Sequence, residues 1–499
     1  MMDRSILLVL LILSQSVTLV HLEDPETWWK IGQEDLREVL RNRPNVNIAK
    51  NVIVFVGDGM GLATISAARI LEGQLENTTG EEGYLYFEKF PNTGLLKPYS
   101  NNMQVSESAA SGTALFSGVK VNSETVGVNS NAVPGRCMNS ANHNIDGLLT
   151  WAQHAGKRTG VVTTTRVTHS TPATLYAHSA EEDWEADVDV DGEQRSHYCK
   201  DIALQLINDV PGNRLNVILG GGSANFLPEC SNASCPTGRR KDGQDLIAKW
   251  KVGKEDAGMH AQYISNHSQL LDNTTIPDFL FGLFSPDKLG YEIDRNETSE
   301  DPSISEMTAK AIRVLQKGPE GFFLMVEGAL IDNAHHRGHA ARALHETIAL
   351  AKAVKLADTL TDDADTLLIV VADHSHSLVF SGYQKRGSPI LGFADSAKIL
   401  DKKPFTTLFY ASGPGAPVNS SRHNLSSEDT GHKDYRQQAF VPTEWSMHLG
   451  EDVPIYAKGP YSHLFSGVHE QHFVAHVVNY AACYRRDIPT ACDETSPNT

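Results

Sequence analysis

Three short apolar runs in this chain each lead to an acidic residue, and they constrain the fold more than any other feature. The acidic residues are Asp58, Glu327 and Asp373, and the runs before them span residues 52–56, 322–326 and 366–372. Such runs are typical of strands buried in a parallel sheet. Open α/β folds bind their ligands at the carboxyl ends of the strands, so we expect these carboxylates to meet there. Taken alone, Asp58 is equally compatible with a helix N-cap.

Histidines accompany these carboxylates. Asp332 and His336 stand four residues apart, so on a helix they would share one face, with the geometry that two ligands of one ion need. An exposed Asp–His pair on a helix surface is the alternative for this segment. His374 follows Asp373 directly, and burying both without a partner would be costly, which favours metal coordination. Together with His448, these residues predict a catalytic centre with several metal ions.

A serine stands where a nucleophile would be useful. Residues 105–114 are mostly small and lead into a predicted helix, with Ser108 near its first turn. Backbone N–H groups and the positive end of the helix dipole suit a bound phosphate or a phosphorylated serine. Ordinary helix packing is the alternative, because small residues are common at helix starts.

In their order along the chain, these motifs resemble those of animal alkaline phosphatases. The motifs lie at residues 57–61, 108–110, 163–172, 326–328, 331–336, 372–376 and 448–452, and the likeness runs from Trp28 to Cys492. The resemblance implies an α/β fold with a mixed, mostly parallel central sheet and helices on both faces. It also implies one such domain over residues 22–493, with a smaller crown-like insertion at about 382–435.

The resemblance further implies two zinc ions and one magnesium ion around a serine that is transiently phosphorylated. One zinc would be held by Asp58, Asp373 and His374 beside Ser108, the second by Asp332, His336 and His448, and magnesium by Asp58, Thr171 and Glu327. His169 and His376 would lie in the surrounding shell. Two cations on either side of an in-line displacement suit phosphoryl transfer, which mainly requires positioning and charge neutralisation.

Two positions depart from the family pattern at the substrate mouth. The residue before the nucleophile is usually Asp but is Glu107 here, and Glu182 stands where the phosphate-binding arginine is expected. Losing a charge-assisted contact costs about 1.5 to 3 kcal/mol, or roughly tenfold to over a hundredfold in affinity. We therefore expect a weakened phosphate monoesterase, for which Arg195 is one candidate replacement cation.

Two other functions compete with that expectation. A non-catalytic relative would keep its metal ions while serving as an extracellular binding or structural protein. A sulfatase or phosphodiesterase of the same superfamily is the second alternative, although the C/S-x-P-x-R context of a sulfatase nucleophile is absent around Ser108.

The N-terminus and the overall charge indicate an exported protein. Residues 1–21 resemble a secretory signal peptide, with a membrane anchor as the competing interpretation. Seven N-x-S/T sequons agree with export, at Asn77, Asn232, Asn266, Asn273, Asn296, Asn419 and Asn424. A net charge of −18 argues against a nucleic-acid partner. We expect a secreted protein without a membrane span, with residues 494–499 as a short tail; a glycolipid-anchored form is expected only if the precursor continues further.

Six cysteines in an exported chain are expected to pair. The family pattern pairs Cys137 with Cys199 and Cys483 with Cys492. Cys230 and Cys235 would then close a small local loop, with two free thiols as the alternative.

Two further segments carry expectations from the resemblance. Residues 25–42 read as an amphipathic helix that reaches across to a partner subunit in a homodimer, or packs on its own domain. The segment from Phe284 to Asp301 resembles part of a calcium site, but Ser285 stands where an acidic ligand is expected.

Overall fold

A ten-stranded sheet forms the centre of the protein, which is described by a computed structural model over residues 24–137, 143–192, 194, 199–230, 237–296, 298–395, 399–418, 421–485 and 487–494. The strands lie in the order β15 (Gly467–Glu470), β2 (Asn92–Lys97), β14 (Val453–Lys458), β8 (Thr366–Ala372), β1 (Asn51–Gly57), β7 (Phe322–Gly328), β3 (Arg158–Arg166), β4 (Val217–Gly221), β6 (Phe279–Leu283) and β5 (Ala261–Ile264). Within this sheet β14 alone runs antiparallel to its neighbours. The prediction of a mixed, mostly parallel sheet is confirmed.

The register of the three central strands brings the predicted carboxylates to one edge. Gly57 of β1 pairs with Gly328 of β7 and with Ala372 of β8. Asp58 and Asp373 therefore follow paired residues, and Glu327 lies one position before the end of β7. The apolar residues of all three strands are fully buried, as expected for strands covered on both faces.

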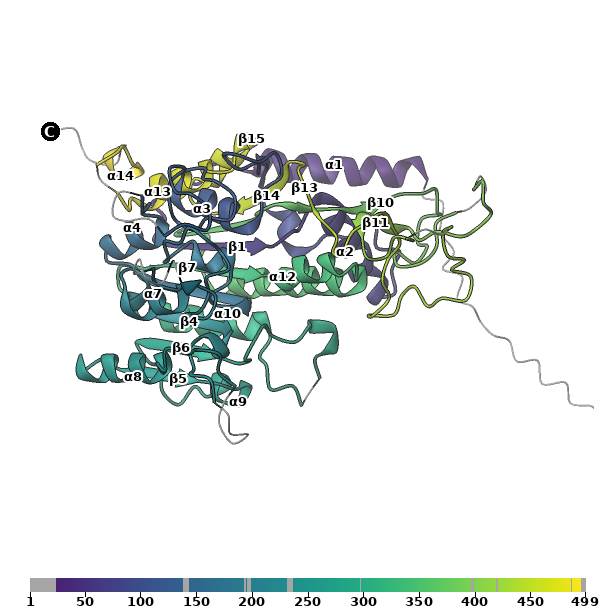
Figure 1. Cartoon of the computed structure of the whole chain (residues 1–499). Helices are drawn as coiled ribbons and strands as arrows, with labels where there is room; N and C mark the ends of the chain where they lie inside the picture. The colour runs from purple at the N-terminus through teal and green to yellow at the C-terminus, as the bar shows by residue number, and fades with distance from the viewer. Residues whose placement is uncertain are drawn as a thin grey trace, which may run out of the picture.

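Helices cover both faces of this sheet (Figure 1). The helices α10 (Ile304–Leu315) and α12 (Ala340–Leu360) pack on one face, with α2 (Leu62–Leu75) and α11 (Leu330–His336) against α12. On the other face lie α3 (Ser108–Ser117), α4 (Leu148–His154) and α13 (Phe473–Ala482). Shorter or more distant helices among the described residues include α5 (Ser170–Ala173), α7 (Ile202–Asn208), α8 (Leu246–Asp256), α9 (His267–Leu271) and α14 (Ala491–Glu494). Short 3₁₀ turns are η1 (Tyr86–Lys89), η3 (Gly212–Arg214), η4 (Ser223–Asn225), η5 (Glu292–Asp294) and η6 (Ser462–Phe465).

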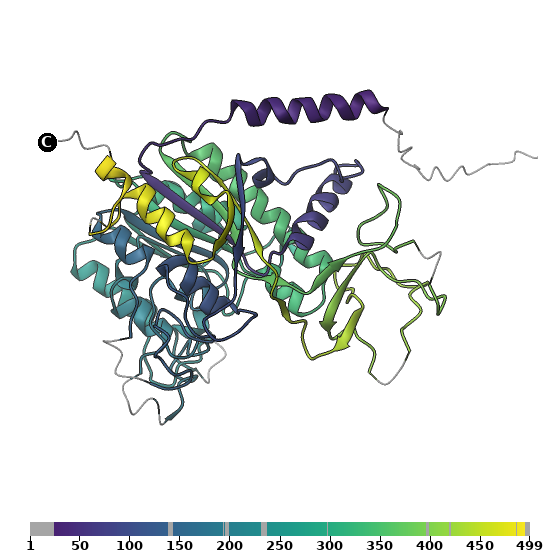
Figure 2. The ribbon, with the colours of Figure 1, turned by 90° about the horizontal axis from the view of Figure 1, so that it is seen from above.

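A second, smaller sheet lies at one end of the molecule and carries projecting loops (Figure 2). Its strands are β10 (Leu378–Phe380), β11 (Leu408–Gly413) and β12 (Ala439–Pro442). The segment at 382–435 that we predicted as a crown-like insertion falls between β10 and β12 and contains β11. A short ribbon of β9 (Ser375–His376) and β13 (His448–Leu449) leads from this region back to the main sheet.

The predicted N-terminal helix forms as α1 (Pro25–Arg41) and lies apart from the main body (Figure 2). The Asp24 carboxylate caps it by accepting a hydrogen bond from the Thr27 N–H at 2.9 Å. None of its residues is buried, and Trp29 and Val39 are each 69% exposed. Among the described residues, no helix combines the length and apolar character needed to cross a membrane.

Two of the predicted disulfides are confirmed. Cys137 is bonded to Cys199, and Cys483 is bonded to Cys492. Cys235, the expected partner of Cys230, lies outside the described residues, as do residues 1–21 and most of the tail, so these expectations stay predictions.

Candidate active site

Two buried carboxylates at the sheet edge, Asp373 and Glu327, each have one oxygen held by a hydrogen bond and one without such a bond, while Asp332 lies among three histidines. Asp373 Oδ1 accepts hydrogen bonds from the N–H groups of Gly59 at 3.1 Å and His374 at 2.8 Å. Glu327 Oε2 accepts from the Thr163 hydroxyl at 2.6 Å, and Asp332 Oδ2 faces His336 Nε2 at 3.1 Å. The other oxygens, Asp373 Oδ2, Glu327 Oε1 and Asp332 Oδ1, have no hydrogen-bond partner within the described residues. Buried carboxylate oxygens without partners are costly, so a cation is their natural counterpart.

The glycine after Asp58 allows these groups to come close together. Gly59 adopts a left-handed conformation with φ of 66°, and a Cβ there would lie 3.1 Å from Asp332 Oδ1. A side chain at this position would therefore crowd the carboxylate from α11 as well as strain the backbone.

Backbone carbonyls fix the tautomers of three histidines. The Nδ1–H groups of His336, His374 and His448 donate to the carbonyls of Ser446 at 2.7 Å, Ser375 at 3.2 Å and Ser106 at 3.1 Å. In the neutral ring this leaves Nε2 as a lone pair on each of the three. A ring nitrogen oriented in this way by its opposite nitrogen is the usual arrangement of a metal-binding histidine.

His376 carries the opposite tautomer. Its Nδ1 accepts a hydrogen bond from the Ser377 N–H at 3.0 Å, so the neutral ring has its proton on Nε2. Nε2 faces Asp332 Oδ1 at 3.5 Å. His376 is therefore suited to orient Asp332, and its place in the surrounding shell stays a prediction.

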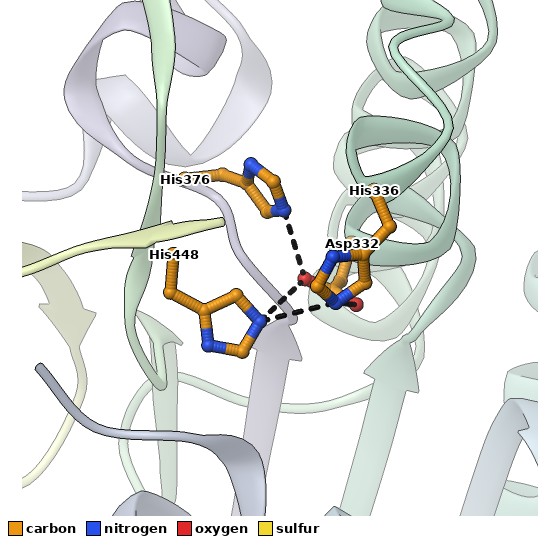
Figure 3. A group of neighbouring side chains, drawn as sticks. All are labelled: Asp332, His336, His376 and His448. Atoms are coloured by element: carbon orange, nitrogen blue, oxygen red, sulfur yellow. Dashed lines mark hydrogen bonds and ion pairs between the residues drawn. The ribbon is translucent and has the colours of Figure 1, made fainter. Parts of the chain in front are cut away.

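Two overlapping groups of possible ligands result (Figure 3 shows the first). The first consists of Asp332, His336, His376 and His448, and the second of Asp58, Asp332 and His374. In the first, His448 Nε2 lies 3.1 Å from His336 Nε2 and 3.4 Å from Asp332 Oδ1. Tetrahedral zinc with bonds of about 2.0–2.1 Å separates its ligand atoms by about 3.3 Å, so these distances fit zinc. The rings of His374 and His448 stack at 3.7 Å between centroids, so the two groups share a wall.

The charges of the site also favour cations. Burial opposes protonation of His336, but Asp332 outweighs it and raises the pKa of His336 to about 9. Burial and the carboxylates of Asp373, Asp332 and Glu327 raise the pKa of Asp58 well above its usual value. The carboxylates around Asp58 and the anionic partner of His336 mark a concentration of negative charge, which bound divalent cations would neutralise.

Thr171 and Glu327 offer oxygen ligands on the side facing β3. The Thr171 hydroxyl is fully buried and, like Glu327 Oε1, has no hydrogen-bond partner within the described residues. Burial raises the pKa of Glu327 to about 7, against the hydrogen bond from the Thr163 hydroxyl. Oxygen-only ligands match a hard cation such as magnesium. We refer to Asp58, Thr171, Glu327, Asp332, His336, Asp373, His374 and His448 as the metal cradle.

Ser108 opens onto this cradle from the first position of α3. Its Oγ lies 3.3 Å from Asp58 Oδ1 and 3.1 Å from His374 Nε2, and the residue is 6% exposed. The helix N-terminus adds a positive dipole end at the same point. The predicted nucleophile therefore meets the cradle residues expected beside it.

Glu107 and Glu182, which we call the mouth pair, are both occupied by hydrogen bonds from the protein. Glu107 caps α3 by accepting a hydrogen bond from the Ala110 N–H at 3.0 Å. It also accepts from the Glu124 N–H of a neighbouring turn at 2.9 Å. Glu182 accepts a hydrogen bond from the Ser170 hydroxyl. Burial and the nearby Glu107 raise the pKa of Glu182 well above its usual value. Arg195, the predicted substitute cation, lies outside the described residues.

Other predicted residues have a smaller part in the described site. His169 is the residue before α5, and its Nδ1 is buried without a hydrogen-bond partner in the described part of the chain. At the expected calcium site, Asp301 Oδ2 accepts from the Gly290 N–H at 2.9 Å. Neither Asp301 nor any residue near it belongs to a group of three possible ligands among the described residues. The calcium ion therefore gains no support here.

Some residues that shape the site were missed from the sequence. The Thr163 hydroxyl holds Glu327, and Ser446 binds His336 through its carbonyl and its N–H, the latter at 2.8 Å from the His336 carbonyl. His335, between two cradle residues on α11, was also missed. The adjacent histidines at 335 and 336 were the one available signal, because the contacts of Thr163 and Ser446 join distant segments.

Comparisons with known proteins agree with this arrangement. The family model for alkaline phosphatase matches residues 49–484. The tissue-nonspecific alkaline phosphatase of Gallus gallus is 46% identical over 491 residues, which cover 96% of this chain and 94% of that protein. The corresponding Homo sapiens enzyme is 45% identical over 472 residues, covering 92% and 89%.

Solved structures show the same fold at lower identity. Thermus thermophilus alkaline phosphatase superposes with a TM-score of 0.63 at 23% identity, covering 91% of this chain and 97% of that one. The alkaline phosphatase of the Antarctic bacterium TAB5 gives 0.60 at 21%, covering 88% and 100%. With the sheet, the strand-end carboxylates and the sequence match in agreement, this chain belongs to the alkaline phosphatase family.

Proposed function

We propose that this protein hydrolyses phosphate monoesters through a phosphorylated Ser108, with two zinc ions and one magnesium ion in the metal cradle. The observation that carries the proposal is the contact of Ser108 Oγ with Asp58 and His374, beside the second group around Asp332. The family membership and the relatives named above support the reaction class. The open carboxylate oxygens and the histidine tautomers support the cations.

The cradle residues would then be divided among the three ions, with Asp58 shared by two of them. Asp58, Asp373 and His374 would hold one zinc, Asp332, His336 and His448 the other, and Asp58, Thr171 and Glu327 the magnesium. When bound, these cations supply positive charge at the entering and leaving oxygens of the phosphoryl group. His376 orients Asp332, and the carbonyls of Ser106, Ser375 and Ser446 orient the histidines.

Ser108 carries the covalent step. Its Oγ gives its proton to solvent water and forms a bond to phosphorus, while the bond from phosphorus to the alcohol oxygen breaks. The alcohol oxygen takes up a proton from solvent, so the alcohol leaves neutral. Water then attacks phosphorus, the bond to Ser108 Oγ breaks, and phosphate is released as the serine regains its proton. Asp58 Oδ1 and His374 Nε2 are the protein atoms placed to orient the hydroxyl.

The mouth pair supports a reduced affinity for phosphate. Both glutamates are used by the protein, and neither offers a positive charge to the substrate. We therefore propose an enzyme with a high KM and intact chemistry.

We further propose a secreted homodimer. The helix α1 has no buried residue and exposes Trp29, Leu36, Val39 and Leu40, which a second copy of the chain would cover. Disulfides and exposed sequons such as Asn77 and Asn424 support passage through an oxidising compartment.

Hydrolysis of p-nitrophenyl phosphate between pH 7 and 11, with zinc and magnesium supplied, tests the central proposal. Ser108→Ala should abolish turnover and the acid-stable label left by radioactive phosphate on the protein. Ser111→Ala is the matched control, because within the described residues its hydroxyl bonds to the carbonyl of Glu107, the N-cap of the same helix, and its loss should leave both readouts in place. Absence of turnover in the unaltered protein despite bound zinc would overturn the proposal.

A further inference from the structure

His335 is a fully buried histidine that takes no part in the proposed mechanism, yet hydrogen bonds engage both of its ring nitrogens. Nε2 lies 3.0 Å from the hydroxyl of Thr64, and Nδ1 lies 2.7 Å from the hydroxyl of Tyr410. In the neutral ring one nitrogen donates and the other accepts, and either hydroxyl can supply the complementary role.

These two bonds join three elements that each lead to the metal cradle. Thr64 lies on α2, which begins four residues after Asp58. His335 lies on α11 between Asp332 and His336. Tyr410 lies on β11 of the small sheet, from which the chain continues through β12 to His448 on β13. The three side chains are at most 1% exposed, so water cannot replace a lost partner without entering the interior.

The ring of His335 also packs against the residue that orients Asp332. The centroids of the His335 and His376 rings are 5.0 Å apart, with their planes tilted by 30°. The Tyr410 ring lies 6.2 Å from the His376 ring at a near-perpendicular angle. His376 therefore has a buried aromatic neighbour on the side of α11 and another on the side of the small sheet, which restrict its rotation.

We infer that His335 is a positioning residue of the Asp332–His336–His448 metal group, and that Tyr410 couples the small sheet to this group through it. The inference rests on the proposed function. Loss of either hydroxyl would leave a ring nitrogen of His335 without a partner and loosen its hold on His376. Because outer partners of metal ligands typically contribute 10–100-fold to metal affinity, the effect should appear in zinc retention.

Tyr410→Phe and Thr64→Val test the inference by each removing one hydroxyl from opposite sides of His335. Substituting His335 itself breaks both bonds and can prevent folding, so these two variants are the sharper probes. Tyr86→Phe is the matched control, because its hydroxyl bonds to Asp358 at 2.5 Å near the far end of α12. That end is about 27 Å along the helix from Ala340, which comes four residues after the cradle residue His336.

Zinc retention against a chelator and the visible spectrum of the cobalt-substituted protein are the readouts. We expect Tyr410→Phe and Thr64→Val each to lose zinc about 5- to 20-fold faster and to shift the cobalt bands, because the ligand geometry changes. Tyr86→Phe should lower the melting temperature only. If Tyr410→Phe and Thr64→Val lose stability but keep the zinc retention and the cobalt spectrum of the parent, His335 is structural and the inference is wrong. If the unaltered protein binds neither metal, the proposed function fails first, and this inference falls with it.

Discussion

The metal cradle and the mouth pair use their carboxylates in opposite ways. In the cradle, Asp332, Glu327 and Asp373 each keep one oxygen without a partner in the described structure. At the mouth, Glu107 and Glu182 are engaged by backbone amides and by a serine hydroxyl. The two regions meet at the start of α3, where Ser108 is the first helical residue and Glu107 is the N-cap directly before it.

This difference separates a region suited to bind cations from one that is complete without a ligand. Buried oxygens without partners beside lone-pair nitrogens are costly unless cations join them, so the cradle is suited to hold cations. The mouth pair is stable without a ligand and contributes no positive charge to one. We therefore expect substitutions in the cradle to abolish turnover, and substitutions in the mouth to change substrate affinity.

The largest effect is expected for Asp332→Asn in the cradle. Its carboxylate faces His336, His376 and His448, so the amide would remove the shared charge from all three. Since even an outer partner of a ligand contributes 10–100-fold, zinc affinity and kcat should each fall by at least about 100-fold. Zinc content by mass spectrometry and steady-state kinetics measure the two quantities.

Asp209→Asn is the control for that substitution. Asp209 pairs with Lys200 at a partly exposed site and should leave zinc content and kcat within twofold. Normal zinc content in Asp332→Asn would show that the cradle holds its cations without this carboxylate.

The next largest effect is expected for Glu182→Arg at the mouth. An arginine there would restore a charge-assisted contact to phosphate and remove the carboxylate beside Glu107, so KM should fall about 10-fold or more with little change in kcat. KM for p-nitrophenyl phosphate and the inhibition constant of inorganic phosphate report this change. Glu181→Arg, one residue away, controls for general surface charge; an equal fall in KM there would make the effect non-specific.

The strand-end carboxylates of the cradle could be predicted because the sequence and the topology point the same way. Apolar runs ending in Asp58, Glu327 and Asp373 indicate parallel strands, and parallel strands place their carboxyl ends together. The spacing of Asp332 and His336 on one helix follows from its period. The family resemblance then assigned these residues to individual metal sites.

The contacts that distinguish ligands from their neighbours could not be predicted. His376 and His448 look alike in the sequence, but one ring accepts from the Ser377 N–H and the other donates to the Ser106 carbonyl. The second contact joins residues more than 300 positions apart. The hydrogen bond from the Glu124 N–H to Glu107 and the two hydroxyl partners of His335 depend in the same way on the tertiary fold.

A smaller effect is expected where the cradle and the mouth meet. Glu185, which is 6% exposed, accepts hydrogen bonds from Arg166 Nε at 2.9 Å and Asn225 Nδ2 at 3.0 Å. It therefore joins the segment after Glu182 to the end of β3, which precedes Thr171. Burial opposes ionisation of Glu185, but Arg166 outweighs it and lowers its pKa. Glu185→Gln should cost about 1–3 kcal/mol of stability and raise the magnesium concentration needed for half activity severalfold, with zinc retention unchanged.

Asp278→Asn provides the comparison for Glu185→Gln. It breaks the ion pair with Arg158 at the opposite end of the same strand, β3, and should affect stability without changing the magnesium requirement. Equal losses of zinc and magnesium in Glu185→Gln would contradict a role confined to the Thr171 side.

The smallest effect on activity is expected for Glu346 on α12, a buried carboxyl outside the cradle, where the change is in stability. Glu346 is 4% exposed and accepts from the Glu292 N–H at 2.6 Å, and burial raises its pKa to about 8. Its folded pKa lies above the unfolded value, so its contribution to stability is complete below about pH 4.5 and is lost as the pH rises to about 8. Glu346→Gln keeps the neutral form, so it should raise the free energy of unfolding by up to about 4 kcal/mol at pH 9.5 relative to its effect at pH 5, at about 1.4 kcal/mol for each pH unit between pH 5 and the folded pKa of about 8. Urea unfolding at the two pH values measures this difference, with the exposed Glu320→Gln as control. A gain of the same size at both pH values would mean that Glu346 is already ionised in the folded protein at pH 5. A buried carboxyl would then be ionised without a cation, whereas the cradle carboxylates are expected to be ionised because cations bind to them.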